Sequence, residues 1–107
     1  MEMRRRASRS EVMVLELIRE YCIARRVRDF TYRQLMRFWW RSKYKGIHWH
    51  TVERVVRDLA ERGYLRRRTV KGRRGYFVVF EVTSELAWEL GLEWESSPTY
   101  REPRLKG

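Results

Sequence analysis

The chain has 107 residues and a formal net charge of +11, with 25 Lys and Arg against 14 Asp and Glu. This length needs only one hydrophobic core, so neither a second domain nor an internal repeat is expected. A pI near 10.6 is higher than solubility requires and indicates a polyanionic partner. Through Phe80, Lys and Arg outnumber acids 22 to 8, whereas from Glu81 onward there are 3 against 6. We therefore expect the binding face in the first three quarters of the chain.

Cys22 is the single cysteine, so the chain cannot form an internal disulfide or a cysteine-based zinc site, and an intracellular location is expected. No apolar run reaches the roughly 20 residues of a membrane span, and the basic start of the chain lacks the apolar stretch of a signal peptide. We therefore expect a soluble cytoplasmic protein that makes no membrane contact. Asn is absent and Arg outnumbers Lys 21 to 4, which fits a protein from a thermophile and equally a GC-rich genome.

The first part of the chain predicts an arm, a helix and a short strand. Residues 1–9 form a basic arm without hydrophobic periodicity. Ser8 and Glu11 have the spacing of a capping box and open a helix that continues to about Arg26. Residues 27–30 are short and extended, and predict a small strand.

Two further helices follow. Thr31 and Gln34 repeat the capping-box spacing and open the second helix, and residues 42–46 supply a turn. The third helix opens at residues 47–48 and closes at Gly63. Its apolar residues recur at helical spacing, at Val52, Val55, Val56 and Leu59.

The next segment predicts a basic β-hairpin. Residues 64–70 and 76–82 read as two strands, and residues 71–75 form a loop with two glycines for turn geometry. Alternate residues of the second strand are expected on one face, against the core: Tyr76, Val78, Phe80 and Val82.

A last helix is expected after Thr83 or Ser84, ending at Gly91. Residues 93–107 contain two prolines among polar residues and predict an extended tail. The chain is thus divided into the basic arm, one domain over residues 10–92, and the tail.

This order of helix, short strand, helix, turn, helix and basic hairpin resembles the winged-helix transcription regulators of bacteria and archaea. The resemblance spans about residues 10–92 and is sharpest over residues 47–82. It implies an α+β fold with a three-helix core, a two- to three-stranded antiparallel β-hairpin wing and a C-terminal helix. In that superfamily the third helix enters the DNA major groove and the wing touches the minor groove or phosphates. Residues 31–46 are several residues longer here than in a tight helix-turn-helix.

Helix geometry predicts which residues of the third helix face a nucleic acid. Taking 100° per residue, some side chains fall within about 30° of the direction opposite the apolar stripe. These residues are His50, Arg54, Arg57 and Glu61. An outward Arg near the start of such a helix can pair bidentately with guanine or meet a phosphate. A solvated charged face would give the same pattern, and Trp49, nearer the stripe, is expected to pack.

The hairpin predicts a second contact surface. Arg66, Arg67 and Arg68 are consecutive and must point to both faces of a strand, which is tolerable only where the ribbon projects past the core. The alternative is that their stems cover the hydrophobic body. With no acid between Glu61 and Glu81, we expect contact with nucleic acid. The candidates are Arg66, Arg67, Arg68, Lys71, Arg73 and Arg74, together with Arg4, Arg5 and Arg6 of the arm.

Other candidates are weaker. His48 and His50 lie two residues apart and would face different ways on a helix, and no cysteine or carboxylate cluster completes a metal site. His48 is instead expected as a cap or turn residue. Trp39, Trp40 and Tyr44 could stack on bases of a single strand, although aromatics at helical spacing are more often core. No phosphate loop and no activated nucleophile is present, so neither an enzyme nor a cofactor is predicted.

The sequence favours a nucleoid-associated protein that binds double-stranded DNA, either a transcription regulator or an architectural factor. The alternative is a basic winged-helix component of a ribonucleoprotein such as the ribosome, which binds RNA with its arm and tail. A third hypothesis is an adaptor with a protein-docking surface at Leu86, Trp88, Leu90 and Trp94. The first and last helices also carry enough apolar residues to allow a homodimer.

Overall fold

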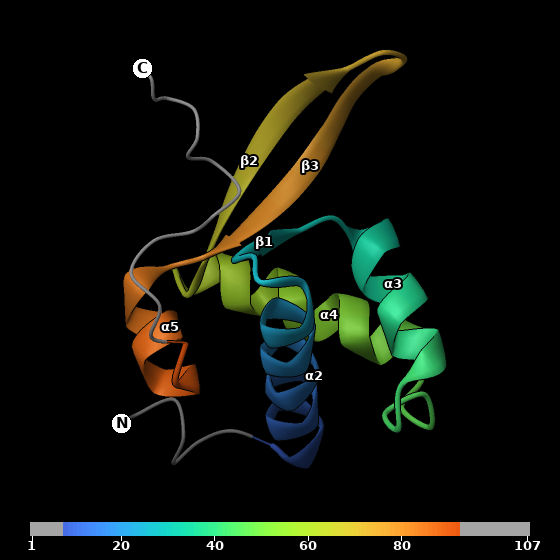
Figure 1. Ribbon diagram of the computed structural model, residues 1–107, viewed down its shortest axis with the longest axis vertical. Coiled ribbons are helices and arrows are strands. Elements are labelled where there is room, and N and C mark those ends of the chain that lie inside the picture. Colours follow the sequence, from blue (N-terminus) through green and yellow to red (C-terminus); the bar gives the residue numbers. More distant parts are fainter. Residues whose placement is uncertain (1–7, 93–107) are drawn as a thin grey trace.

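The computed structural model describes residues 8–92 as an α+β fold (Figure 1). In chain order, the elements are α2 (Arg9–Arg25), β1 (Asp29–Phe30), α3 (Tyr32–Arg41), α4 (Trp49–Glu61), β2 (Leu65–Gly72), β3 (Gly75–Val82) and α5 (Ser84–Leu90). These described residues contain four helices and one three-stranded antiparallel sheet. The predicted α+β class is confirmed, while the predicted arm and tail, with Arg4, Arg5, Arg6 and Trp94, lie outside the described residues apart from Ser8 and Arg9.

The predicted caps open the first helices. The Thr31 hydroxyl accepts a hydrogen bond from the Gln34 backbone N–H at 3.1 Å, and the Gln34 side chain accepts from the Thr31 N–H at 3.0 Å. Ser8 accepts in the same way from the Glu11 N–H at 3.1 Å. These bonds satisfy backbone donors that have no partner within the first turn of a helix, and so they fix where α2 and α3 begin.

The sheet has the strand order β1-β3-β2. β2 and β3 pair continuously from Leu65 opposite Val82 to Gly72 opposite Gly75. The predicted five-residue loop is therefore wrong, because both strands extend to the glycines and only Arg73 and Arg74 form the turn. Gly75 has φ 126°, a backbone conformation that favours glycine. The positive φ of Gly75 allows the chain to reverse over two residues, in a shorter turn than the predicted loop over residues 71–75.

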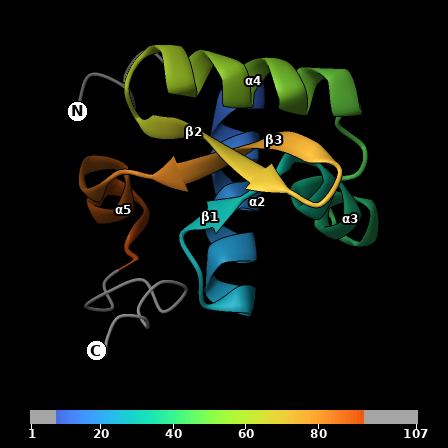
Figure 2. The ribbon, with the colours of Figure 1, turned by 90° about the horizontal axis from the view of Figure 1, so that it is seen from above.

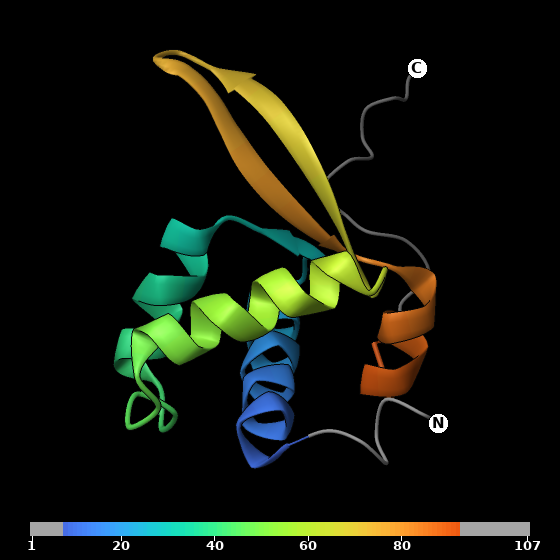
Figure 3. The ribbon, with the colours of Figure 1, turned by 180° about the vertical axis from the view of Figure 1, so that it is seen from behind.

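The core lies where the helices meet the base of the sheet, and α2 runs behind both α4 and the sheet when seen from above (Figure 2). Phe30 and Phe80 stack against each other with ring centroids 5.9 Å apart. The far half of the hairpin projects beyond the helices (Figures 1 and 3). Burial on β3 consequently decreases toward the tip: Phe80 is buried, Val78 is half-buried and Tyr76 is 72% exposed. The prediction that Tyr76 lies against the core is wrong. Tyr76 is on the same strand face as Phe80, as predicted, but the core does not extend that far along the hairpin.

The long connection between α3 and α4 is fixed by two aromatic residues. The Trp39 indole donates hydrogen bonds to the carbonyls of Tyr44 and Ile47, at 3.1 and 3.0 Å. The Tyr44 hydroxyl donates to Glu20 of α2 at 2.8 Å. Both rings are buried, so the idea that they stack on bases is wrong. They secure the extra residues to the body of the protein, and thereby set the position of the start of α4.

Candidate nucleic-acid interface

The outer face of α4 carries the residues that helix geometry predicted. Its apolar stripe is buried: Val52, Val55, Val56 and Leu59. His50, Arg54 and Arg57 are exposed on the other side. Trp49 is half-buried and packs against Trp39 with ring centroids 5.4 Å apart, as expected. Glu61, the fourth residue predicted for this face, is exposed as well. The helix therefore presents two arginines, a histidine and a glutamate to solvent along one face.

The two histidines lie at the start of this helix. His48 is the N-cap residue, and its Nδ1 accepts a hydrogen bond from the His50 backbone N–H at 3.1 Å. The prediction that the two rings face different ways is wrong, since they stack with centroids 5.0 Å apart. His48 has extended rather than helical dihedral angles, so the helical angle between the two positions does not apply. His50 Nδ1 also lies 3.3 Å from Glu53 Oε1.

The strand register sorts the hairpin cations by face. Directly paired residues of antiparallel strands point the same way, and successive residues alternate. Arg67 pairs with Phe80 and Lys71 with Tyr76, so both share the face that lies on the core at the hairpin base. Arg66 and Arg68 point to the opposite face. The three consecutive arginines are therefore not equivalent.

Arg68 is engaged within the sheet. Its guanidinium lies 3.7 Å from an Asp29 carboxylate oxygen and 3.7 Å from a Glu81 carboxylate oxygen. Asp29 and Glu81 are paired between β1 and β3, so this contact crosses all three strands. The sequence contains no acid near Arg68 along the chain, and the pairing of β1 brings one to it. Much of the Arg68 charge is consequently balanced by the protein itself.

Helix and hairpin meet at a hollow of about 410 Å³. It is lined by Tyr32, Arg57, Ala60, Glu61, Arg67 and Phe80. Two predicted binding residues, Arg57 of α4 and Arg67 of β2, thus share one concave surface. Tyr32 also lines this hollow, although the sequence did not predict it. Its ring packs on the ring of Phe80, with centroids 4.9 Å apart, and only this tertiary contact places it there.

Charges around the hollow act on Tyr32. Burial raises the pKa of its hydroxyl, Arg57 lowers that pKa, Glu53 raises it and Arg67 lowers it. A ligand in the hollow would therefore meet arginines from two elements, with Glu61 on one side. Beyond it, the hairpin tip adds three exposed cations: Lys71, Arg73 and Arg74.

The surface predicted for protein docking is only partly exposed. Trp88 is 78% exposed, but Leu86 is fully buried in the core and Leu90 is half-buried. The prediction that Leu86 contributes to a docking surface is wrong, because the inner face of α5 packs on the domain. Trp88 lies on the outer face of α5 and does not take part in that packing.

Within residues 8–92, no group of three or more His, Cys, Asp or Glu side chains could hold a metal ion. None of the helices in this part of the chain is long and apolar enough to cross a membrane. No protein-family model, curated protein or solved structure matches the sequence. Function is therefore inferred from the geometry of α4 and the hairpin.

Proposed function

We propose that this protein is a winged-helix DNA-binding protein, either a transcription regulator or an architectural factor of the nucleoid. In this proposal α4 is the recognition helix and enters the major groove, and the β2–β3 hairpin is the wing. The element order and the α+β architecture support this, since a helical body with a projecting antiparallel hairpin is the layout that the proposal requires.

The convergence of Arg57 and Arg67 on one hollow carries the proposal. A duplex is wide enough to contact two neighbouring elements at once, and a contact with either element alone would leave the other arginine unused. Because the register also aligns Lys71 on the same face as Arg67, positive charge continues from the helix toward the hairpin tip. This is the electrostatic footprint expected for a polyanion.

The proposal assigns different roles to the two elements. Arg54 and Arg57, on the exposed face of α4, reach base edges, where an arginine can pair bidentately with guanine. Arg67, Lys71 and the turn arginines meet phosphates, which fix position without reading sequence. Glu53 lies beside the exposed helix face and Glu61 lies on it, near its C-terminal end. Both carboxylates repel phosphates, so backbone contacts are displaced toward the hairpin.

Salt dependence tests this function. The proposed contact surface includes six cations: Arg54, Arg57, Arg67, Lys71, Arg73 and Arg74. Each phosphate neutralised contributes about −0.9 to the log-log slope of affinity against salt. We therefore expect a slope of about −3.6 for a blunt duplex if only the four hairpin cations meet phosphates, and of about −5.4 if all six do. Fluorescence anisotropy across a salt series measures it. A slope shallower than about −2 would rule out the proposed interface.

A structured RNA at matched salt provides the comparison. A module built around a groove-binding helix should prefer the DNA duplex, because the deep and narrow major groove of A-form RNA does not admit α4. Tighter binding to the RNA would replace this proposal with the ribonucleoprotein function.

A further inference from the structure

Trp40 is an exposed indole on α3 that the proposed function leaves unused. Its neighbour Trp39 points inward and is only 9% exposed, whereas Trp40 is 62% exposed. The two rings touch, with centroids 5.9 Å apart. Burying a large aromatic ring is favourable, so an indole left in water on a helix that already contributes to the core is a candidate contact site.

Cations surround this ring. A hollow of about 320 Å³ is lined by Met36, Arg37, Trp39, Trp40 and Arg41, and none of these residues is acidic. The Lys45 ammonium lies over the Trp40 ring, 5.1 Å from its centroid. The whole of α3, from Tyr32 to Arg41, contains no acid. An exposed apolar ring with cations beside it suits a ligand that has a flat aromatic part and an anionic part next to it.

The Trp40 ring is held rigidly next to the start of α4. The Trp39 ring contacts the Trp40 ring at a tilt, and the Trp39 indole N–H donates to the carbonyls of Tyr44 and Ile47. Trp39 also packs on Trp49, the first residue of α4. Trp40 is therefore tied to the N-terminal end of the helix proposed to enter the groove, away from the hollow that Arg57 and Arg67 share.

We propose that Trp40 is a stacking platform for an unpaired base of the bound nucleic acid, with Arg37, Arg41 and Lys45 beside its phosphates. The ligand class is a DNA duplex that carries a single-stranded extension or junction. Every base offers a π face to an indole, and single-strand binders combine such stacking with a basic surface. This inference rests on the proposed duplex binding and adds a second contact to it.

A comparison with Trp88 shows why the neighbouring charges determine which ligand an exposed indole can bind. It is even more exposed than Trp40, but Glu85 and Glu89 are its neighbours on α5. An acidic surround repels phosphates, so the same indole there does not suit a nucleotide. Trp88 is thus the matched control: the same residue type, on a helix surface, with acids and not cations beside it on its own helix.

The test compares three probes by anisotropy at one salt concentration: a blunt duplex, the same duplex with a short single-stranded extension, and the extension strand alone. Wild-type protein is expected to bind the extended duplex about fivefold to a hundredfold more tightly than the blunt one. Trp40→Ala should abolish that gain and leave blunt-duplex affinity unchanged. Trp40→Phe should keep part of it, and Trp88→Ala all of it.

The outcomes separate the two proposals. If wild-type protein binds both duplexes equally, or if Trp40→Ala keeps the gain, the stacking site is wrong while duplex binding stands. If the blunt duplex does not bind but the single strand binds through Trp40, the proposed function fails and the stacking site stands. If none of the probes binds, both fail. Far-UV circular dichroism of each variant confirms that it is folded.

Discussion

The role of each arginine in the hairpin is decided by a single step of strand register. Arg67 faces the hollow beside α4, while Arg66, one residue earlier, faces away and lies opposite Glu81. Arg68 also faces away and forms ion pairs with two acids of the sheet. Charge alone would rank these side chains as equal. In the proposed interface, orientation makes Arg67 a ligand contact and Arg68 a structural residue.

Cys22 is a residue whose ionisation opposes folding. Its side chain is fully buried, and burial raises the pKa of the thiol from 9.0 to about 12. The raised pKa means that the neutral thiol contributes stability fully below pH 9, and that this contribution is lost as pH rises toward 12. Between these limits the unfolded chain ionises and the folded protein does not.

We therefore expect the free energy of unfolding of wild-type protein to fall by about 2 kcal/mol more than that of Cys22→Ala between pH 9 and pH 11. Urea denaturation at a series of pH values measures this. Ionising tyrosines lower the stability of both proteins in the same pH range, so the difference between the two curves reports the thiol together with its coupling to Tyr21. Parallel curves for the two proteins would show that the buried thiol does not control alkaline stability.

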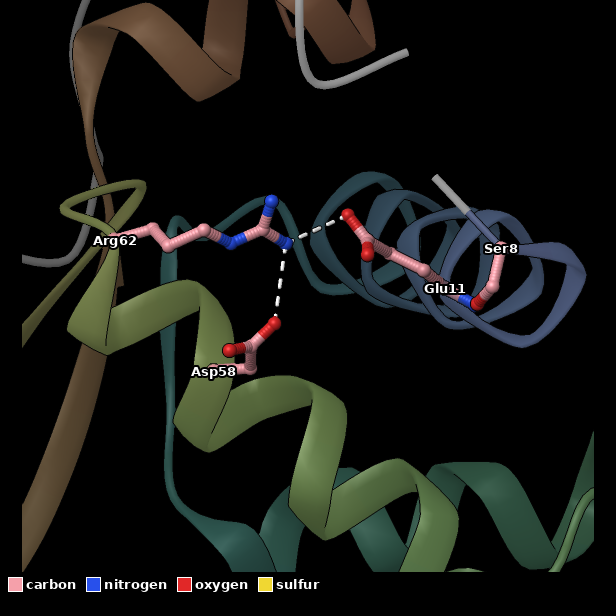
Figure 4. A network of polar contacts seen from close by, with 4 residues as sticks. All are labelled: Ser8, Glu11, Asp58 and Arg62. Atoms are coloured by element: carbon pink, nitrogen blue, oxygen red, sulfur yellow. Dashed lines mark hydrogen bonds and ion pairs between the residues drawn. The ribbon is translucent and has the colours of Figure 1, made fainter. Parts of the chain in front are cut away.

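At the scale of elements, the end of α4 is tied to the start of α2 by an ion-pair network (Figure 4). Arg62 lies 2.8 Å from a Glu11 carboxylate oxygen and 3.3 Å from an Asp58 oxygen. Glu11 is nearly buried, and its hydrogen bond raises the pKa of the Arg62 guanidinium. This network links the C-terminal end of α4 to the N-terminal end of α2.

Arg62→Met should lower the free energy of unfolding by about 1 to 2 kcal/mol, because it leaves the Glu11 carboxylate without its partner. Arg62 is about a third exposed, which keeps the loss below that of a fully buried pair. Adding Glu11→Gln to Arg62→Met should recover part of the loss by removing the uncompensated charge. Asp58→Asn, at the exposed end of the network, should change stability by less than about 0.5 kcal/mol.

Chemical denaturation of these variants measures the energies. If Arg62→Met and Asp58→Asn cost the same, the contact with Glu11 is no stronger than an exposed pair.

Local signals were sufficient to predict most elements. Ser8 and Thr31 carry the hydrogen-bonding groups that open their helices, and the apolar spacing of α4 gave its buried and exposed faces. The tertiary contacts were beyond local signals. Nothing in the chain near Arg68 indicates that β1 will bring Asp29 to it, and helical spacing could not separate Trp39 from Trp40. The site was therefore predicted as residue types on two elements, and its shape required the fold.

At the scale of the whole molecule, we propose that one face, shared by α4 and the hairpin, binds the duplex. A protein with a net charge of +11 attracts DNA to any surface, so loss of charge alone is not informative. The decisive comparison removes the same charge from different faces. Arg57→Ala with Arg67→Ala empties the shared hollow, whereas Arg25→Ala with Arg66→Ala removes two exposed arginines that lie elsewhere.

The most direct measurement is the affinity of these two double variants for one blunt duplex across a salt series, with thermal melting to confirm that both are folded. We expect Arg57→Ala with Arg67→Ala to weaken binding about tenfold to fiftyfold near physiological salt and to reduce the log-log slope by about 1, because Arg67 meets a phosphate whereas Arg57 reaches a base edge. The Arg25 and Arg66 pair should change affinity less than about threefold. Equal losses in the two variants would contradict the account, since binding would then depend on total charge and not on the face that α4 and the hairpin share.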